Sequence, residues 1–302
     1  MSAPTQTRPL SSASTAGAAR RALLPHFKLE RIALMIAALF ITAFALTPFL
    51  FALTTSFKSQ IDSIDGTVIP FLQYQPTLIN WQQEFVSGGA ETFKSLRNSA
   101  LIASGACLLA TTLGTLAGYG LARFKYGIGN RNLVSWFLSQ RFLPPIATVI
   151  PFVLLFRDLR LIDTLPGMVI INTTFTLPFA VLIMRDYFAD FPSELREAAL
   201  VDGASEFGVF ARIVLPLATP ALVASAIICF AFAWNEYLFA SVLTNREWKP
   251  YPMMVAGTDS VRGIMFNFVS TRMIIAVALP VLLSLLVQRF IVRGLTFGAV
   301  KG

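Results

Sequence analysis

Residues 197–216 read EAALVDGASEFGVFARIVLP, a polar elbow between two apolar runs that are each long enough to cross a bilayer. Ser193 and Glu194 are typical of a helix start and Gly203 of a helix end. The sequence therefore predicts a short helix over residues 194–202 with Ser193 as its N-cap. Ser205 is expected to cap a second helix that runs up to a break at Pro216.

The composition places the rest of the chain in a membrane. Of the 302 residues, 55% are hydrophobic and 13% charged, whereas charged residues make up about 25% of soluble domains. We predict an all-α membrane protein with six transmembrane helices, in which Pro178 and Pro280 interrupt the fourth and sixth. The predicted spans are residues 32–53, 98–121, 133–156, 168–184, 217–240 and 273–288.

Lys and Arg are denser in the segments that lie on the side of the elbow and of both termini. This bias favours both termini and the elbow in the cytoplasm. Residues 1–31, rich in Ser, Thr, Ala and Pro at their start, are expected to form a disordered cytoplasmic tail. Residues 32–302 are expected to form one membrane domain.

Several functional classes are excluded by what the sequence lacks. It contains no Gly-x-x-x-x-Gly-Lys-Ser/Thr loop for nucleotide phosphates, so any ATP must be hydrolysed by another subunit. Basic residues form no stripe interleaved with aromatic residues, which argues against nucleic acid as a partner. Cys107 and Cys229 lie in predicted spans, and His26 stands alone. We therefore expect no catalytic residue, no disulfide and no metal site.

The elbow resembles the coupling loop of ABC-importer permeases, here within residues 185–216. Its pattern is Glu-Ala-Ala, three residues, Gly, nine residues and Ile-x-Leu-Pro, and every specified position is present. Further similarity to the six-span subunit of carbohydrate-uptake permeases of the maltose-transporter type is carried by Pro144-Pro145, Pro151, LPF at 177–179, FAWNEY at 232–237 and GLTFGAVKG at 294–302. The resemblance implies a type I ABC importer permease fold with a cytoplasmic coupling helix, and residues 32–302 as a six-span permease domain.

The resemblance also implies the protein's partners and role. They are a second, different permease subunit in a heterodimer, an ABC ATPase dimer that binds ATP and Mg²⁺, and a periplasmic or lipid-anchored sugar-binding protein, all within or beside membrane lipid. No cofactor is expected on this chain, which would carry a sugar or sugar alcohol rather than act as an enzyme. The residues expected to meet the ATPase are Glu197, Ala198, Ala199, Asp202 and Gly203, where the two alanines let a helix face sit tightly in a groove.

Intramembrane polar groups are candidates for the substrate path, because a charge at a helix centre costs at least ~2.5–3.5 kcal/mol. Arg141 precedes Pro144-Pro145, which can open the helix where a hydrated cavity satisfies the backbone. The candidate path consists of Gln140, Arg141, Asn172, Asn235 and Glu236. Arg141 lies about 12 Å and Glu236 about 28 Å from the cytoplasmic ends of their helices, so separate partners are expected. Alternatively, Glu236 reaches water or bonds to a neighbouring helix.

Two other classes of function stay open at this point. A six-span secondary transporter or channel, acting as a homo-oligomer, should show coupling-ion carboxylates near the midplane and repeat symmetry. A non-transporting membrane scaffold or assembly factor has no use for the coupling motif. The transport subunit is therefore the leading interpretation.

Overall fold

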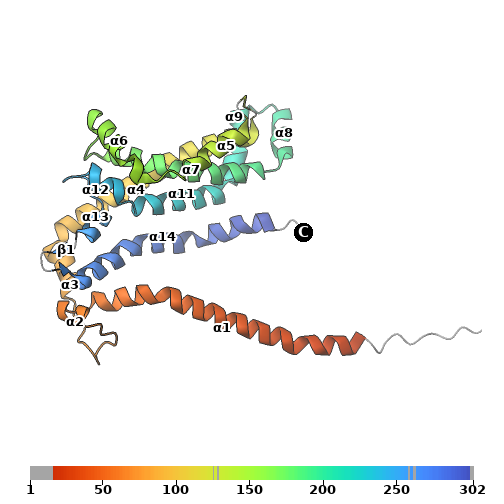
Figure 1. Ribbon diagram of the computed structural model, residues 1–302. Helices are drawn as coiled ribbons and strands as arrows, with labels where there is room; N and C mark the ends of the chain where they lie inside the picture. Colours follow the sequence, from red (N-terminus) through yellow and green to blue (C-terminus); the bar gives the residue numbers. More distant parts are fainter. Residues whose placement is uncertain (1–15, 125, 128, 258, 261–262, 300–302) are drawn as a thin grey trace, which may run out of the picture. The chain divides into compact units, whose positions relative to one another are not determined.

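A computed structural model describes residues 16–124, 126–127, 129–257, 259–260 and 263–299 (Figure 1). The chain divides into two compact units, Met1–Ala52 and Leu53–Gly302. Most of α1 (Ala16–Ser56) forms the described part of the first unit, and its segment Glu30–Ser56 is long and apolar enough to cross a membrane. The helix begins within the segment expected to be a disordered tail, where Ala, Arg and Leu favour helix.

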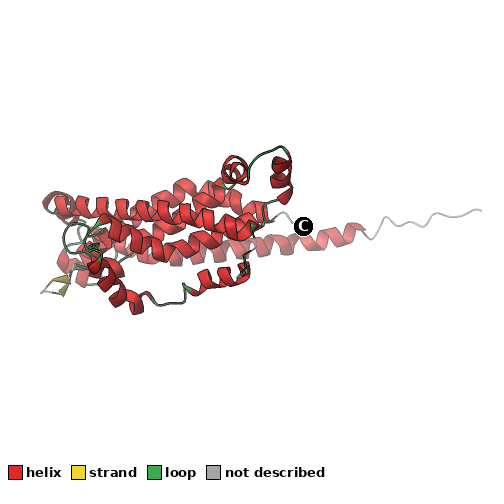
Figure 2. Cartoon of the chain, turned by 90° about the horizontal axis from the view of Figure 1, so that it is seen from above, coloured by secondary structure: helices red, strands yellow, loops and turns green. Residues whose placement is uncertain are grey.

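The second unit is nearly all helical in its described residues, as predicted (Figure 2). A short hairpin pairs β1 (Asp259–Ser260) with the antiparallel β2 (Gly263–Ile264). The helices are α2 (Gln60–Ile64), α3 (Ile79–Gln82), the π-helical η1 (Gln83–Ser87), α4 (Gly89–Arg123), α5 (Asn130–Ser139), α6 (Pro145–Asp158), α7 (Leu165–Ala189), α8 (Ser193–Val201), α9 (Glu206–Val209), the π-helical η2 (Phe210–Val214), α10 (Leu215–Leu217), α11 (Thr219–Trp234), α12 (Leu238–Leu243), α13 (Tyr251–Ala256) and α14 (Phe266–Ala299).

Four of the described helices are long and apolar enough to cross a membrane, namely α1, α4, α7 and α14. A fifth span is obtained if Glu206–Leu217 and Thr219–Trp234, which meet at 74°, are taken together. The predicted third span, residues 133–156, is divided between α5 and α6, which are separated by residues 140–144, where the sequence indicates that proline can open the helix. A proline disfavours the α conformation in the residue before it, and here Pro144, which precedes Pro145, has an extended ψ of 123°.

Other boundaries also differ from the prediction. Pro178 and Pro280 lie inside α7 and α14 and end neither helix, since proline is tolerated in membrane helices whose neighbours satisfy the backbone. The fifth span, predicted over 217–240, ends at Trp234, and α12 starts only at Leu238. The break between these helices places a short non-helical stretch next to the cavities described below.

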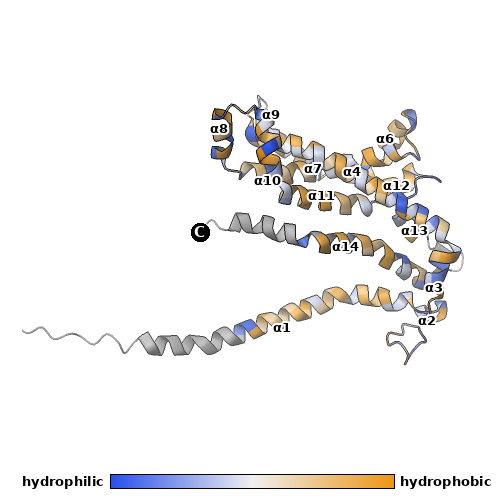
Figure 3. Ribbon diagram, turned by 180° about the vertical axis from the view of Figure 1, so that it is seen from behind, coloured by the Kyte–Doolittle hydropathy of each residue, from blue (hydrophilic) through white to orange (hydrophobic). Residues whose placement is uncertain are grey.

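The core of the second unit is the contact between α4 and α7. A Cβ on Gly114 would lie 2.4 Å from the Cβ of Ala180, and one on Gly118 would lie 2.7 Å from the backbone nitrogen of Arg185. Glycine at these two positions lets the helices approach backbone to backbone. Figure 3 shows apolar residues along α4, α7 and α11, with hydrophilic residues gathered at the two ends of the bundle. We call them the α8 end and the α13 end, after a helix that each of them contains.

Candidate functional site

The α8 end presents the predicted coupling helix. α8 runs Ser193–Val201 with Pro192 in the N-cap position and no side-chain cap bond, so the prediction of Ser193 as the N-cap is wrong by one residue. Pro192, one position earlier, has an extended ψ of 125°, so the helix begins after this residue instead. Glu194 lies in the first turn, where a carboxylate interacts favourably with the helix dipole.

The C-terminus of α8 is closed by Gly203, as the sequence predicts. Gly203 has φ of +86°, and its N–H donates to the carbonyl of Leu200 at 3.0 Å. The N–H of Ala204 donates to the carbonyl of Ala199 at 3.0 Å, and these two bonds together form a Schellman motif. Since no atom lies within 4 Å of a Cβ built on Gly203, the requirement for glycine is the left-handed backbone and not space.

The five predicted coupling residues divide between two faces of this segment. Glu197, Ala198, Asp202 and Gly203 are exposed, whereas Ala199 is buried against the bundle. Sequence reasoning missed two apolar side chains that extend the exposed face, Val201 (88% exposed) and Phe207 (73% exposed). Large apolar side chains presented next to carboxylates form a surface suited to another protein.

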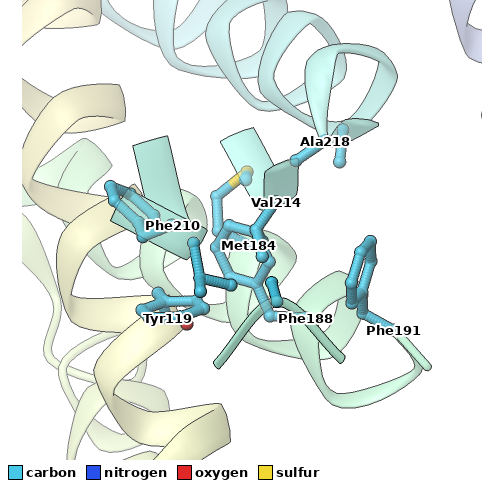
Figure 4. Close-up of a cluster of buried hydrophobic side chains, with 10 residues drawn as sticks. Tyr119, Met184, Phe188, Phe191, Phe210, Val214 and Ala218 are labelled. Atoms are coloured by element: carbon cyan, nitrogen blue, oxygen red, sulfur yellow. The ribbon is translucent and has the colours of Figure 1, made fainter. Parts of the chain in front are cut away.

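A buried aromatic cluster ties this face to the spans (Figure 4). Tyr119 from α4 lies 4.7 Å from Phe210 and 5.4 Å from Phe188 between ring centroids. Arg123 donates to the carbonyl of Phe191 at 2.7 Å. The predicted coupling segment, residues 193–209, is therefore attached to both α4 and α7 through side chains with little freedom to move.

An ion pair links α8 to the next helix. The Arg196 guanidinium donates to both carboxylate oxygens of Glu206, and this hydrogen bonding raises the pKa of Arg196. Ser205 caps α9 by accepting from the N–H of Gly208 at 3.1 Å, as predicted. The helical path then passes through Pro216 and bends at Ala218, so the predicted break at Pro216 is wrong by two residues.

The predicted substrate-path residues line two adjoining cavities. One, of 260 Å³, contains Gln140 and Arg141 at its wall, and the other, of 300 Å³, contains Asn172, Asn235 and Glu236. Both cavities share three further lining residues, Pro145, Phe175 and Phe232. The structure thus brings the five residues to one region, between the α5–α6 break and the α11–α12 break.

Arg141 and Glu236 have separate partners, as expected. The Cζ atom of Arg141 lies 3.3 Å from the ring centroid of Phe179, a stacked cation–π contact. The Glu236 carboxylate accepts from the N–H of Phe239 at 2.6 Å and of Ala240 at 3.0 Å, and so caps α12. Asn172 and Asn235 each donate to a carbonyl one turn back, at 2.9 and 2.8 Å. Gln140 and Arg141 are exposed at the wall of the first cavity, whereas Asn172 is buried.

Residues 110–296 match the family of binding-protein-dependent transport system inner membrane components. The chain belongs to this family. The trehalose/maltose transport system permease protein MalG of Thermococcus litoralis is 30% identical over 91% of this chain and 98% of its own. The trehalose transport system permease protein SugB of Mycobacterium tuberculosis is 33% identical over 87% of this chain and 94% of its own. The predicted transport subunit is thereby confirmed, and the secondary-carrier and scaffold alternatives are set aside.

Solved structures support the fold of this permease. A bacterial ABC transporter involved in the import of the acidic polysaccharide alginate contains a chain with a TM-score of 0.67 and 22% identity, covering 86% of this chain and 96% of that one. The MetNI methionine ABC transporter gives a TM-score of 0.55 at 17% identity, covering 68% and 98%. The predicted ABC importer permease fold is confirmed.

The α13 end of the permease holds a buried polar network that the sequence did not suggest. Glu84 (2% exposed) accepts from the Arg272 guanidinium at 2.9 Å, from Thr92 at 2.9 Å and from Tyr251 at 3.3 Å. Burial and the neighbouring Glu84 charge raise the pKa of Tyr251. The network joins η1, α4, α13 and α14 and thereby fixes this end of the bundle.

Proposed function

We propose that this permease imports a sugar or sugar alcohol, driven by ATP hydrolysis on separate ATPase subunits that contact α8. The observation that carries the proposal is the exposed acidic and small-residue face of α8, closed by a Schellman motif and attached to α4 and α7. Glu197 is exposed in mid-helix and offers a carboxylate to a basic side chain of the ATPase. Ala198 permits close approach of the partner's surface.

The proposed orientation places the coupling loop (residues 185–216) and both termini in the cytoplasm. The distribution of Lys and Arg supports it, because cytoplasmic loops carry an excess of both. The α13 end, at the opposite end of α4, then faces outward. The permease is a multi-pass protein of the bacterial cytoplasmic membrane in this proposal.

The proposed complex contains a second, different permease subunit, an ABC ATPase dimer and a periplasmic or lipid-anchored binding protein. ATP and Mg²⁺ are assigned to the ATPase and no cofactor to this chain. The outer face of α4 carries exposed apolar side chains, among them Leu108 (72% exposed) and Leu116 (51% exposed). Surface of this kind requires lipid or the second permease as its neighbour.

Coupling is tested with the complete transporter in proteoliposomes. Glu197→Lys places a cation against a basic partner, and Gly203→Val forces a β-branched residue into the left-handed region. Each is expected to lower uptake and substrate-stimulated ATPase activity about tenfold or more, because like-charge contacts cost several kcal/mol and such backbone strain costs about 1–3 kcal/mol. Glu194→Lys, on the same helix, and Gly203→Asn, which tolerates the left-handed region, are matched controls expected to keep most activity. Wild-type uptake in both test variants would refute the assignment.

The substrate proposal rests on the two cavities and on the relatives. Two relatives are named as trehalose/maltose and trehalose transport permeases. The cavities combine aromatic walls with polar groups, including the Arg141 guanidinium, the Gln140 amide and the Thr148 hydroxyl. Guanidinium and amide donors suit hydroxyl oxygens, and aromatic walls suit the apolar faces of a sugar ring.

The path is tested by Arg141→Leu, which removes five N–H donors while keeping an apolar contact to Phe179. Uptake is expected to fall while the ATPase still co-purifies with the permease. Arg157→Leu, an exposed arginine on α6 that lies beside Asp158 and outside both cavities, is the matched control. Normal uptake by Arg141→Leu, or loss of assembly, would remove the substrate-path role. The sugar itself is identified from the ligand of the binding protein.

A further inference from the structure

A polar pocket of 430 Å³ at the α13 end gathers four basic side chains around one acidic side chain. The basic residues are Lys94, Arg246, Lys249 and Arg272, and the acidic residue is Glu91. Lys94 pairs with Glu247 at 3.0 Å, and Arg272 pairs with the buried Glu84. Arg246 and Lys249 are exposed, and neither forms an ion pair within the part of the chain that the structure describes. The pocket therefore presents two uncommitted cations to solvent.

The segment that carries these two cations, residues 244–250, is held from two sides. The Asp163 carboxylate accepts from the backbone N–H groups of Arg246 at 2.9 Å, Glu247 at 3.0 Å and Trp248 at 2.9 Å. From α4, the Asn98 amide donates to the carbonyls of Glu247 at 2.7 Å and Lys249 at 3.2 Å. A loop fixed in this way loses little conformational entropy when a partner binds.

The Asp163 carboxylate that holds this segment is charged at neutral pH. Burial disfavours the Asp163 carboxylate, but the backbone N–H groups outweigh this effect and lower the pKa of Asp163 below its ordinary value. Asp163 also has φ of +54°, a left-handed conformation that costs energy in a residue other than glycine. Such a geometry persists only where the surrounding contacts hold it.

We propose that this pocket receives an acidic side chain of the substrate-binding protein, with Arg246 and Lys249 as the contacting residues and Asp163 as a positioning residue. The inference rests on the proposed function, since it deepens the docking of that partner. Lys94 lies roughly 38 Å along α4 from Tyr119, so the pocket is on the opposite end from the ATPase-facing surface. The mixed charges of the pocket suit an aqueous interface more than a contact with a second permease in lipid.

Glu91 allows the proposal to be tested by the direction in which a substitution changes docking. A carboxylate on the permease repels an incoming carboxylate, so its neutralisation strengthens docking, whereas reversal of Arg246 and Lys249 weakens docking. A residue with only a structural role in the pocket has no reason to show effects of opposite sign. The variants are therefore Arg246→Glu/Lys249→Glu and Glu91→Gln, with Arg157→Glu as an exposed control outside the pocket.

The experiment uses the complete transporter in nanodiscs and measures ATPase activity against the concentration of substrate-loaded binding protein. The double reversal is expected to raise the half-stimulating concentration about tenfold or more at low salt, and Glu91→Gln to lower it about threefold. High salt weakens wild-type docking and narrows these differences. The control is expected to match wild type.

Other outcomes separate the explanations. An unchanged half-stimulating concentration in the double reversal overturns the pocket assignment while the proposed function stands. Absence of stimulation in the wild type contradicts the proposed function itself. If the double reversal prevents the ATPase from co-purifying, Arg246→Gln/Lys249→Gln replaces it in the experiment. This neutral variant is expected to raise the half-stimulating concentration by an intermediate factor. If the reversal instead alters basal ATPase activity in proportion to the phosphatidylglycerol content of the nanodisc, the pocket binds a lipid headgroup and the proposal is wrong.

Discussion

The closest approach between α4 and α7 predicts that Gly114→Ala destabilises the permease strongly for a change of one methyl group. The added Cβ would lie 2.4 Å from the Ala180 Cβ and 2.8 Å from the Ala180 carbonyl carbon, whereas carbon atoms in contact prefer about 3.5–4.0 Å. Neither obstructing atom can rotate away, so the helices must separate by about 1 Å. Overpacking of this kind costs about 2–3 kcal/mol, roughly 30- to 150-fold in the unfolding equilibrium.

Helix propensity offsets little of this cost. Alanine is more favourable than glycine in a helix by about 1 kcal/mol in water. A helix in a bilayer stays helical even when it is not packed, so alanine stabilises the folded and the unfolded permease equally. SDS-induced unfolding of the purified permease in mixed micelles, followed by tryptophan fluorescence, measures the difference. Gly89→Ala, on the same helix with its nearest atoms at 3.9 Å, is the control and should be neutral or stabilising. Equal stability of Gly114→Ala and wild type would refute the packing argument.

The remaining predictions concern the α13 end and the topology. Arg272→Met leaves the Glu84 carboxylate buried without its cation and should cost about 3–5 kcal/mol in the same unfolding assay, while Glu84→Gln/Arg272→Met should recover part of this loss. Folding lowers the pKa of Asp163, so the stability that its carboxylate contributes is complete above the ordinary pKa of an aspartate and is lost as the pH falls through the lower folded value. Asp163→Asn should therefore have a smaller free energy of unfolding at neutral pH. Its stability, followed by Trp248 fluorescence, should also change less as the pH is lowered. In a background without Cys107 and Cys229, a cysteine at position 88 should react with an impermeant reagent in intact cells and one at position 197 should not; the reverse pattern would overturn the orientation.

The coupling segment was largely predictable because its determinants are local. A left-handed residue after a short helix requires glycine, and Gly203 meets this need in the sequence as it does in the structure. The N-cap was misplaced by one residue because Ser193 and Pro192 are both acceptable at a helix start, and only the backbone angles decide between them.

Helix breaks within apolar runs were harder to predict. Average hydropathy over residues 133–156 is high whether or not the chain leaves the helix at Pro144, so hydropathy alone predicts one span and does not place the break that Pro144-Pro145 indicate. The same averaging merged α12 with α11 and hid the role of Glu236, whose carboxylate closes the N-terminus of α12. An acid within a predicted span was visible in the sequence, but the N–H groups that it binds depend on a helix boundary that the sequence did not indicate.

Contacts between distant parts of the sequence could not be predicted at all. Glu84 and Arg272 are separated by most of the chain, and each is an ordinary charged residue in its own segment. Asp163 reads as a loop residue until the fold brings residues 246–248 over it. A single sequence contains no pattern that pairs such positions, and so the basic pocket emerges only from the tertiary structure.

The two ends of the permease share one continuous helix. α4 has 35 residues, about 52 Å, and carries Asn98 near the basic pocket and Tyr119 in the cluster under the coupling segment. Its glycines let it approach α7 backbone to backbone, whereas the α5–α6 and α11–α12 breaks border the two cavities. This arrangement favours transmission by α4 and α7 as a rigid pair, with adjustment confined to the broken helices around the solute. Gly114→Ala should then impair coupling as well as stability, giving binding-protein-stimulated ATP hydrolysis with reduced uptake per ATP.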